Sequence, residues 1–221
     1  MERVCEPELM NDPQQSLAYA RADFAASHQM IADAFHAWAT TREGMTLLDL
    51  GCGPGDVTMR LIEVMPPMSI DAVDGAGQML ELFEGRLADH PGCRSEVNLI
   101  EGLIGEVALP REHYDLIVSS SLLHHLHDPM VLWNAIDAVG RAGCKVFVVD
   151  LVRPGSLDEV ARLVDAHADG EPEVLREDFR ASMCAAFRPS EIEKQLVAAG
   201  FMDRFSVAML GERHLVIKGQ L

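Results

Sequence analysis

The stretch that decides the fold is Leu47-Leu48-Asp49-Leu50-Gly51-Cys52-Gly53-Pro54-Gly55. An apolar strand carries an acidic residue near its end, and three glycines at alternate positions then turn the chain into a helix. Glycine permits a sharp turn and lets a ligand come closer than a Cβ atom would allow. The helix that follows begins with backbone N–H groups that have no partner inside the helix. The pattern predicts a ligand-binding turn at the carboxyl end of a buried strand.

The spacing of these glycines excludes two kinds of phosphate site. A dinucleotide fingerprint needs glycine at the first, third and sixth positions, but the sixth position counted from Gly51 is Asp56. A P-loop ends in Gly-Lys-Ser/Thr, whereas Gly55 is followed by Asp56-Val57. A carboxylate at this place would repel a pyrophosphate, so we expect a ligand that carries no phosphate.

The chain beyond this stretch alternates strands and helices. Five strands are expected, at Thr46–Leu50, Ser69–Asp74, Val97–Glu101, Tyr114–Ser119 and Cys144–Leu151. Three helices are expected between them, at Val57–Val64, from Gln78 to Ala88 and at Met130–Val139. Alternating strands and helices form a parallel sheet with helices on both faces, so the fold class is α/β.

The N-terminal part precedes this alternating unit. Residues 1–13 are polar, contain prolines and are expected to be poorly ordered. Residues 14–40 are interpreted as an N-terminal helical region, because apolar residues recur there at helical spacing.

The C-terminal part follows the fifth strand. Residues 154–188 are charged and are expected to form a cap of two short helices, separated by Gly170-Glu171-Pro172. A further helix over residues 189–199 ends before Gly200, a natural C-terminal cap. Arg204–Met209 and His214–Lys218 then read as a hairpin that adds an antiparallel strand at the edge of the sheet. We interpret residues 1–221 as one domain.

The composition limits the partners of the chain. A formal charge of −17 repels polyanions, and no cluster of Lys and Arg offers a nucleic-acid surface. No apolar run approaches the ~20 residues of a membrane span, and the first residues do not resemble a signal peptide. The five scattered cysteines fit neither a disulfide framework nor a zinc motif. We therefore expect a cytoplasmic protein with a small-molecule substrate and without a nucleic-acid or membrane partner, while the oligomeric state is not predicted.

The glycine-rich stretch resembles motif I of the class I S-adenosylmethionine-dependent methyltransferases, whose cofactor carries no phosphate. The resemblance covers residues 46–150 in motifs and continues to Leu221 in the order of elements alone. It implies a Rossmann-like sheet of seven strands that is mostly parallel, has an antiparallel last strand, and bears the cap after the fifth strand. The alternative is a tight strand-to-helix turn in another α/β protein.

The cofactor site is expected around the ends of the first four strands. Asp49 would lie beside a bound ammonium group, and Asp74, just over twenty residues after Gly51, stands where an acidic residue binds ribose hydroxyls. Many family members place an Asp where Leu103 falls, so this chain departs from the pattern at the adenine and would use apolar contacts there. The expected cofactor-binding residues are Tyr19, Asp49, Gly51, Cys52, Gly53, Asp74, Gly75, Met79, Leu103, Ile104, Ser119 and Ser120.

Adjacent histidines mark the expected reaction side. His124 and His125 would point about 100° apart on a helix, so we assign His124 to the pocket as a general base and His125 to a supporting role. His124 stands where some O-methyltransferases of the family have a carboxylate that acts at the acceptor. Two structural histidines are an open alternative. A metal site of His124, His125 and His127 lacks a carboxylate at a recognised spacing, so no metal is expected.

The cap is expected to select the substrate. Arg153, Arg176 and Arg180 could clamp an anionic acceptor, the last two on one helix face. The competing interpretation is a solvated helix whose arginines pair with neighbouring acids.

The sequence thus predicts an enzyme that transfers a methyl group from S-adenosylmethionine to a small-molecule acceptor and gives S-adenosylhomocysteine. The sulfonium activates the methyl group, so alignment of the acceptor supplies much of the catalysis. Two alternatives stay open: another group transfer from an adenosyl cofactor, and a protein that binds the cofactor without catalysis.

Overall fold

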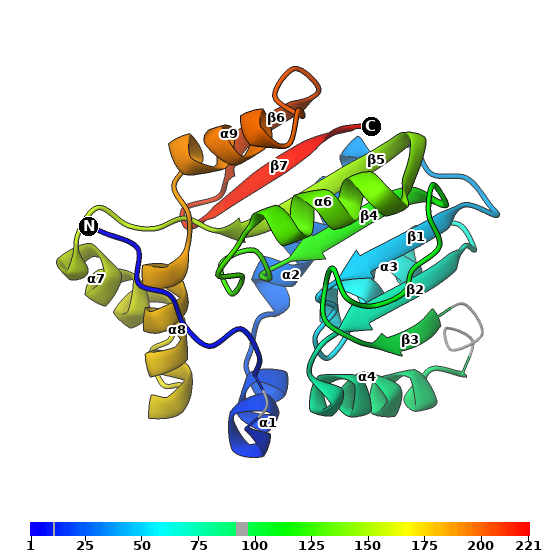
Figure 1. The fold of residues 1–221 in the computed structure, drawn as a ribbon. Coiled ribbons are helices and arrows are strands. Elements are labelled where there is room, and N and C mark those ends of the chain that lie inside the picture. Colours follow the sequence, from blue (N-terminus) through cyan, green and yellow to red (C-terminus); the bar gives the residue numbers. More distant parts are fainter. Residues whose placement is uncertain (11, 92–96) are drawn as a thin grey trace.

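One seven-stranded sheet forms the centre of the protein in residues 1–10, 12–91 and 97–221, which this computed structural model describes. The strand order is β3-β2-β1-β4-β5-β7-β6 (Figure 1). The first five strands pair in parallel, whereas β7 is antiparallel to both β5 and β6. The strands are β1 (Thr46–Leu50), β2 (Ser69–Asp74), β3 (Val97–Glu101), β4 (Tyr114–Ser120), β5 (Gly140–Leu151), β6 (Phe205–Leu210) and β7 (His214–Gln220). The predicted α/β sheet with an antiparallel last strand is confirmed.

Side chains of the strands alternate between two helical layers. Leu48 and Leu50 of β1 belong to a core with α6 (Met130–Val139) and α9 (Pro189–Ala198). Leu47, between them, packs with α2 (Ala25–Trp38) and α3 (Asp56–Val64) on the opposite face. The α4 helix (Gly77–Asp89) covers β2 and β3 beside this second layer.

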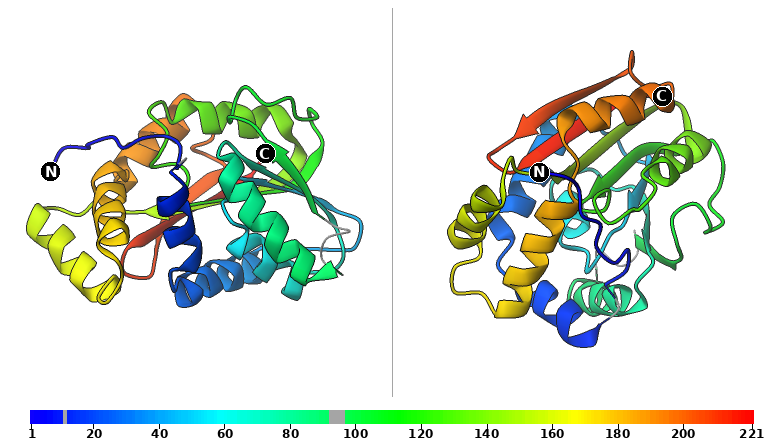
Figure 2. Two further views of the ribbon diagram at one scale, coloured as in Figure 1. Left: turned by 90° about the horizontal axis from the view of Figure 1, so that it is seen from below. Right: turned by 60° about the vertical axis from the view of Figure 1, so that its left-hand side comes forward.

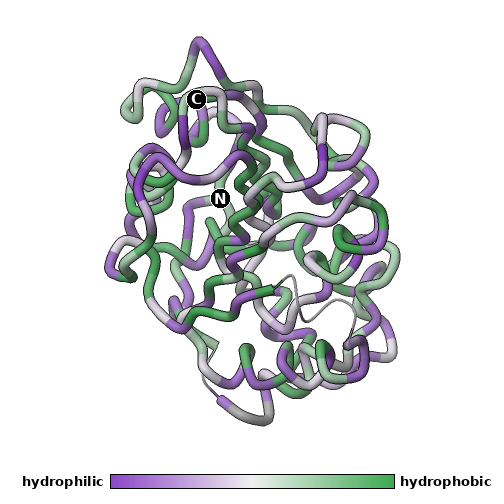
Figure 3. Tube along the Cα trace, turned by 90° about the vertical axis from the view of Figure 1, so that its right-hand side faces the viewer, coloured by the Kyte–Doolittle hydropathy of each residue, from purple (hydrophilic) through white to green (hydrophobic). Residues whose placement is uncertain are grey.

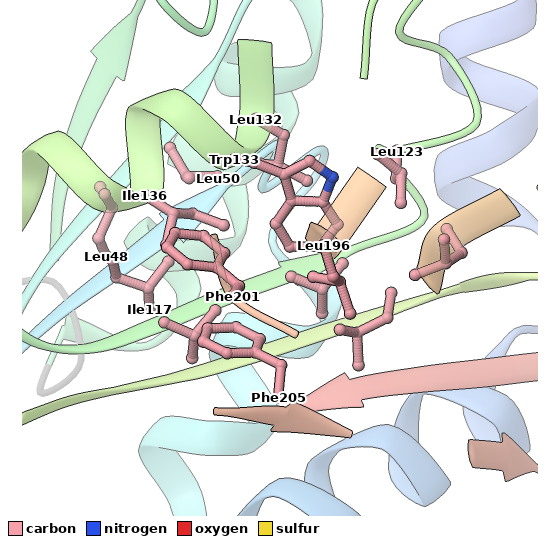
Figure 4. Packing of buried hydrophobic residues seen from close by; sticks show 14 of the residues in the cluster. Leu48, Leu50, Ile117, Leu123, Leu132, Trp133, Ile136, Leu196, Phe201 and Phe205 are labelled. Carbon is pink, nitrogen blue, oxygen red and sulfur yellow. The ribbon is translucent and has the colours of Figure 1, made fainter. Parts of the chain in front are cut away.

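Aromatic side chains fill the layer under α6 and α9. Trp133 is fully buried and donates a hydrogen bond from its indole nitrogen to Gln195 Oε1 over 2.9 Å. Phe201 and Phe205 stack with ring centroids 4.8 Å apart against the same cluster (Figure 4). Along the trace, hydrophobic residues gather on the central strands and hydrophilic ones on the outer loops (Figure 3). This rigid centre positions the strand ends that carry the site.

The N-terminal helical region consists of two helices, not the single helix expected over residues 14–40. They are α1 (Pro13–Arg21) and α2, and the chain bends between them. The chain bends at Asp23, whose carboxylate accepts a hydrogen bond from the Ala25 backbone N–H over 3.1 Å, a local contact typical of a turn. As a result α1 leaves the sheet and lies between α4 and α8 (Figure 2).

The cap has the two helices predicted from the sequence, α7 (Leu157–His167) and α8 (Glu173–Ala185). Ser156 caps α7 by accepting a hydrogen bond from the Glu159 N–H over 3.2 Å. Val160, Val164 and Met183 form a small separate core at the end of β5. The cap therefore stands beside the carboxyl edge of the sheet.

Residues 1–10, expected to be poorly ordered, lie as an extended strap along the cap. Figure 1 shows this N-terminal strap running past α8 toward α1. The Val4 N–H donates a hydrogen bond to the Cys184 carbonyl over 3.1 Å. The Arg3 guanidinium donates to the carbonyls of Ala185 and His124 and lies 4.0 Å from the centroid of the Phe187 ring. Backbone hydrogen bonds and the contacts of Arg3 hold the strap. Sequence patterns detect regularly spaced apolar residues, so they do not reveal contacts of this kind.

None of the helices in the described ranges combines the length and apolar character needed to cross a bilayer. Cys5, Cys52, Cys144 and Cys184 are free thiols, and Cys93 lies outside the described residues.

Candidate active site

A cavity of about 330 Å³ lies at the carboxyl ends of β1, β2 and β4. The glycine turn after β1 forms one side, and the cap and the loop after β4 form the other. The strap and α1 close it over the top, through Leu9, Met10 and Tyr19. Ligands of open parallel sheets bind at this edge.

The glycine turn leaves open space toward the cavity. Gly53 has a φ of +53°, and a Cβ atom built on it would meet no atom within 4 Å. Gly55 has a φ of +83°, and a Cβ atom there would overlap the Phe83 ring. The turn thus needs glycine at position 55 for packing and offers an uncovered backbone at position 53, which a ligand can approach closely.

Asp49 places a buried carboxylate at the floor of the cavity. Its exposed fraction is 2%, and its described partner is the Thr58 hydroxyl, which donates a hydrogen bond to it. Burial raises the pKa of this carboxyl to about 7, because a charge away from water is costly without a counter-ion. A cationic ligand group would supply that counter-ion. Cys52 beside it also has a pKa raised by burial, and its protonated thiol fits the role of a small spacer.

Asp74 ties the ends of β2 and the glycine turn together. Its two oxygens accept hydrogen bonds from the backbone N–H groups of Gly53 and Ala76, each over 2.8 Å. Burial raises the pKa of this carboxyl. Each carboxylate oxygen keeps a second lone pair, so Asp74 can still accept hydroxyl groups of a ligand.

An apolar face completes this half of the cavity. Gly75, Met79, Leu103 and Ile104, which the sequence predicts to bind the cofactor, all line it. Leu9 of the strap lies against Gly75, since a Cβ atom on that glycine would come within 2.7 Å of Leu9 Cδ2.

Tyr19 and Ser120 also reach the cavity, as predicted, but Ser119 does not. The Tyr19 ring packs against Phe24 with centroids 4.9 Å apart, and burial raises the pKa of its hydroxyl. Ser119 is fully buried between strands, where its hydroxyl donates to the Leu50 carbonyl over 2.8 Å. Strand alternation explains the difference, because neighbouring residues of β4 point to opposite faces.

The three arginines proposed as an acceptor clamp do not line the cavity. Arg153 donates to the Ala186 carbonyl over 2.9 Å and to Glu191 over 2.5 Å. Arg176 donates to the Ala168 carbonyl over 2.9 Å and to Asp165 over 2.7 Å, and Arg180 is exposed. Their charges hold the cap together or face solvent.

Arg213, at the start of β7, is the arginine that reaches the cavity in the described part of the chain. Its guanidinium lies 5.2 Å from the centroid of the Phe179 ring, and its buried Nε has no hydrogen-bond partner among the described residues. Burial lowers the pKa of this group. The hairpin of β6 and β7 folds back along β5 and so brings Arg213 to the cavity. No local pattern in the sequence indicates that position.

The charges around the cavity are otherwise mostly acidic. The carboxylate residues that line it are Glu8, Asp23, Asp49, Asp56, Asp74, Glu106, Glu171 and Asp178. This lining favours a cationic ligand at the glycine turn, while Arg213 can bind an anionic group on the opposite side.

His124 lines the cavity from the loop after β4, here called the histidine loop (residues 121–129). It is nearly fully buried, and its Nδ1 lies 2.5 Å from Asp150 Oδ1. Its backbone N–H donates to the other Asp150 oxygen over 3.0 Å. Burial alone would lower the pKa of the imidazole, but the Asp150 carboxylate outweighs burial and raises it. The pair keeps the pKa of Asp150 below its usual value.

Glu6 of the strap meets both histidines. Glu6 Oε1 lies 3.3 Å from His124 Nε2 and 3.3 Å from His125 Nδ1. Burial raises the pKa of Glu6, whereas burial and the neighbouring His124 lower that of His125 to about 3. Sequence reasoning missed Glu6 and Asp150. Asp150 had a signal, since it is a polar residue near the carboxyl end of an apolar strand, but Glu6 had none.

Comparisons with known proteins agree with this architecture. Residues 47–143 match the family model described as a methyltransferase domain. Over 87 residues the chain is 34% identical to the malonyl-[acyl-carrier protein] O-methyltransferase of Halalkalibacterium halodurans. The aligned stretch covers 39% of this chain and 32% of that protein. Over 128 residues it is 25% identical to the ubiquinone/menaquinone biosynthesis C-methyltransferase of Vibrio campbellii, 58% of this chain and 49% of that protein.

A solved structure extends the likeness to nearly the whole fold. A methyltransferase from Aquifex aeolicus that depends on S-adenosylmethionine superposes with a TM-score of 0.70 at 16% identity. The superposition covers 95% of this chain and 98% of that one. The aligned part of the chain spans a third to a half of the length of these curated relatives.

Proposed function

We propose that this chain, whose residues 47–143 match a methyltransferase domain and whose fold superposes on a methyltransferase that depends on S-adenosylmethionine, transfers the methyl group of that cofactor to a small-molecule acceptor. One observation carries the proposal. A buried carboxylate without a cation, Asp49, lies beside the uncovered backbone of Gly53, and His124 lines the same cavity from the acceptor side.

The residues of the glycine-turn side fit this cofactor. Asp49 would neutralise its ammonium group, and the free lone pairs of Asp74 would accept the ribose hydroxyls. The open space at Gly53 would admit the part of the cofactor that joins its ammonium group to its ribose. Leu103 and Ile104 would contact the adenine ring. When bound, the cofactor supplies a methyl group that its sulfonium already activates.

The acceptor side would orient the nucleophile and take up its proton. Asp150 holds Nδ1 of His124, which leaves Nε2, 3.3 Å from Glu6 Oε1, as the ring nitrogen that would take up the proton. This arrangement of a carboxylate behind an imidazole is the one that fixes a general base in other enzymes. Ser182 and the cap residue Phe179 line this side and would enclose the acceptor.

Arg213 indicates the chemistry of the acceptor. A half-buried guanidinium with an unpartnered Nε would bind a carboxylate or another anionic group of the substrate. The two curated relatives are named as an O-methyltransferase and a C-methyltransferase, so their names do not settle the acceptor atom.

The test measures binding and turnover separately. Calorimetry with S-adenosylmethionine reports binding, and incubation with methyl-labelled cofactor and a metabolite extract reports transfer. Labelled product together with S-adenosylhomocysteine supports the proposal. Binding with no transfer across such extracts would favour a non-catalytic cofactor-binding protein, and loss of the cofactor without S-adenosylhomocysteine would favour another group transfer.

A further inference from the structure

Three side chains from distant parts of the sequence converge between the strap and the histidine loop. They are Glu6, His124 and His125, whose ligand atoms all lie within 4.8 Å of one another. Glu6 Oε1 is 3.3 Å from a ring nitrogen of each histidine. The two rings lie nearly side by side, with centroids 4.2 Å apart.

Glu6 Oε1 has no hydrogen-bond partner in the described part of the chain. The Glu6 side chain is only 10% exposed, and Ser182 donates a hydrogen bond over 3.3 Å to its other oxygen, Oε2. The guanidinium of Arg3, on the same strap, donates to backbone carbonyls and to Cys5 Sγ instead. A buried carboxylate oxygen left without a donor is costly, so the structure provides an acceptor whose partner remains to be supplied.

Two of the three separations between ligand atoms match those around a small metal ion. A tetrahedral ion with bonds of about 2.0–2.1 Å holds its ligand atoms about 3.3–3.4 Å apart. Both nitrogen–oxygen separations have this value, although neither contact meets hydrogen-bond geometry. Ring nitrogens favour a transition metal such as Zn²⁺ over Mg²⁺ or Ca²⁺.

A supporting carboxylate already fixes one of the ligands. Asp150 lies 2.5 Å from Nδ1 of His124 and so presents Nε2 to Glu6. Histidines that bind zinc commonly donate their second ring N–H to such a carboxylate. His125 Nδ1 also lies 3.4 Å from the Pro7 carbonyl, and this weak contact would be given up when the proton moves to Nε2.

We propose that Glu6, His124 and His125 bind a divalent transition metal of the Zn²⁺ type, with a fourth coordination position supplied from the cavity. His124 and His125 both line that cavity, so a water molecule or an acceptor oxygen can complete the coordination. The inference extends the proposed function. With metal bound, Nε2 of His124 would be a ligand and could not act as the general base. The metal would instead lower the pKa of an acceptor hydroxyl bound to it. Metal binding would also fasten the strap over the cavity through Glu6.

The test uses the full chain without a histidine tag, freed of metal by a chelator, with no cofactor or acceptor present. Calorimetry with Zn²⁺ and visible absorption with Co²⁺ report binding and tetrahedral geometry. We expect one ion per chain, and at least tenfold weaker binding for Glu6→Gln and His125→Ala. Asp150→Asn, which removes the supporting carboxylate, should weaken binding by roughly 10- to 100-fold.

Matched controls separate the site from general metal affinity. Glu2→Gln alters an exposed carboxylate of the same strap that does not line the cavity, and His113→Ala alters an exposed histidine just before β4. Both should bind Zn²⁺ as the unaltered protein does, and thermal melting should show that every variant is folded. The proposal is overturned if the chain binds no stoichiometric ion, or if Glu6→Gln and His125→Ala bind as tightly as the controls. Glu6 would then be an ion-pair partner of a protonated His124. Because no turnover is measured, failure of methyl transfer would leave this result intact.

Discussion

The two halves of the cavity are built in different ways. The glycine-turn half comes from β1, β2 and the turns that follow them, within residues 49–79 and a short stretch after β3. The acceptor half combines the strap, the histidine loop, the cap and the turn before β7, whose lining residues stretch from Glu8 to Arg213. The first half is a local motif, whereas the second exists only after the chain has folded.

This difference separates the chemistry of the two halves. The turn half presents buried carboxylates that fit a cation, Asp49 above all. The acceptor half holds its charges in pairs, such as His124 with Asp150, and contains the one arginine that reaches the cavity in the described residues. Substitutions in one half should therefore leave the other half working, and each prediction below tests that separation.

The largest effect is expected from His124→Ala in the acceptor half. Turnover should fall by roughly 10²- to 10⁴-fold, because the acceptor loses the group that takes up or directs its proton. The Kd of S-adenosylmethionine should stay within about twofold, since the turn half is unchanged. Steady-state kinetics and calorimetry measure the two quantities.

His113→Ala is the matched control, because His113 is exposed and lies at the opposite end of β4. Its turnover should equal that of the unaltered chain. An unchanged rate for His124→Ala would assign that histidine to packing, and a large loss of cofactor affinity would show that the two halves are not separable.

The next largest effect is expected from Asp49→Asn in the turn half. Removing one partner of a buried charge pair typically costs about 2–5 kcal/mol of binding, a factor of roughly 30 to several thousand in Kd. The free protein should be no less stable, because its buried carboxylate has no counter-ion there. Calorimetry and thermal melting test both statements.

Asp71→Asn serves as the control, because Asp71 lies on β2 and bonds Asn98 and Tyr114 outside the cavity. Cofactor affinity equal in both variants would refute the ammonium site. A stability loss confined to Asp49→Asn would instead make Asp49 a structural partner of Thr58.

The same division explains what the sequence could predict. β1, β2 and β3 were predicted to the residue, since buried strands and their turns carry local patterns. Most expected cofactor residues do line the cavity, because they follow strand ends directly. The prediction of a poorly ordered N-terminus was wrong, because Arg3 and Glu6 hold the strap through contacts with chain more than a hundred residues away.

The acceptor clamp shows the limit most clearly. Arg153 and Arg176 were candidates on charge and spacing, but nearby carbonyls and acids satisfy both groups. Arg213 reaches the cavity through the antiparallel pairing of β7 with β5. Sheet pairing at long range, and not a local motif, decides which arginine meets the substrate.

A smaller effect is expected from Arg213→Met. If the acceptor carries an anionic group, loss of a charged hydrogen bond worth about 1.5–3 kcal/mol should raise its KM by roughly 10- to 150-fold. kcat should change little, and cofactor affinity should not change. Arg180→Met is the control, because Arg180 is exposed on the cap and does not line the cavity. Equal KM values for the two variants would remove Arg213 from the acceptor site.

The smallest effect is the pH dependence of cofactor binding. Burial raises the pKa of Asp49 to about 7 in the free protein, and a bound ammonium group would favour the charged carboxylate and lower that pKa. The free protein then binds more protons than the complex below about pH 7. Binding releases a proton in that range, so Kd should rise about tenfold for each unit by which the pH falls from 7 toward 5.

Asp49→Asn distinguishes this carboxyl from the other acids of the cavity. The variant binds weakly at every pH, but its Kd should be nearly flat between pH 7 and 6, because an amide does not titrate. A slope that survives the substitution would assign the proton to another group, with Asp74 the first candidate since burial raises its pKa as well. Measuring the slope on chelator-treated protein excludes metal binding at Glu6 and the histidines as its source. The rise of Kd below pH 7 thus reports on the turn half alone. If Asp49→Asn abolishes this rise while turnover still depends on His124, the two halves are independent.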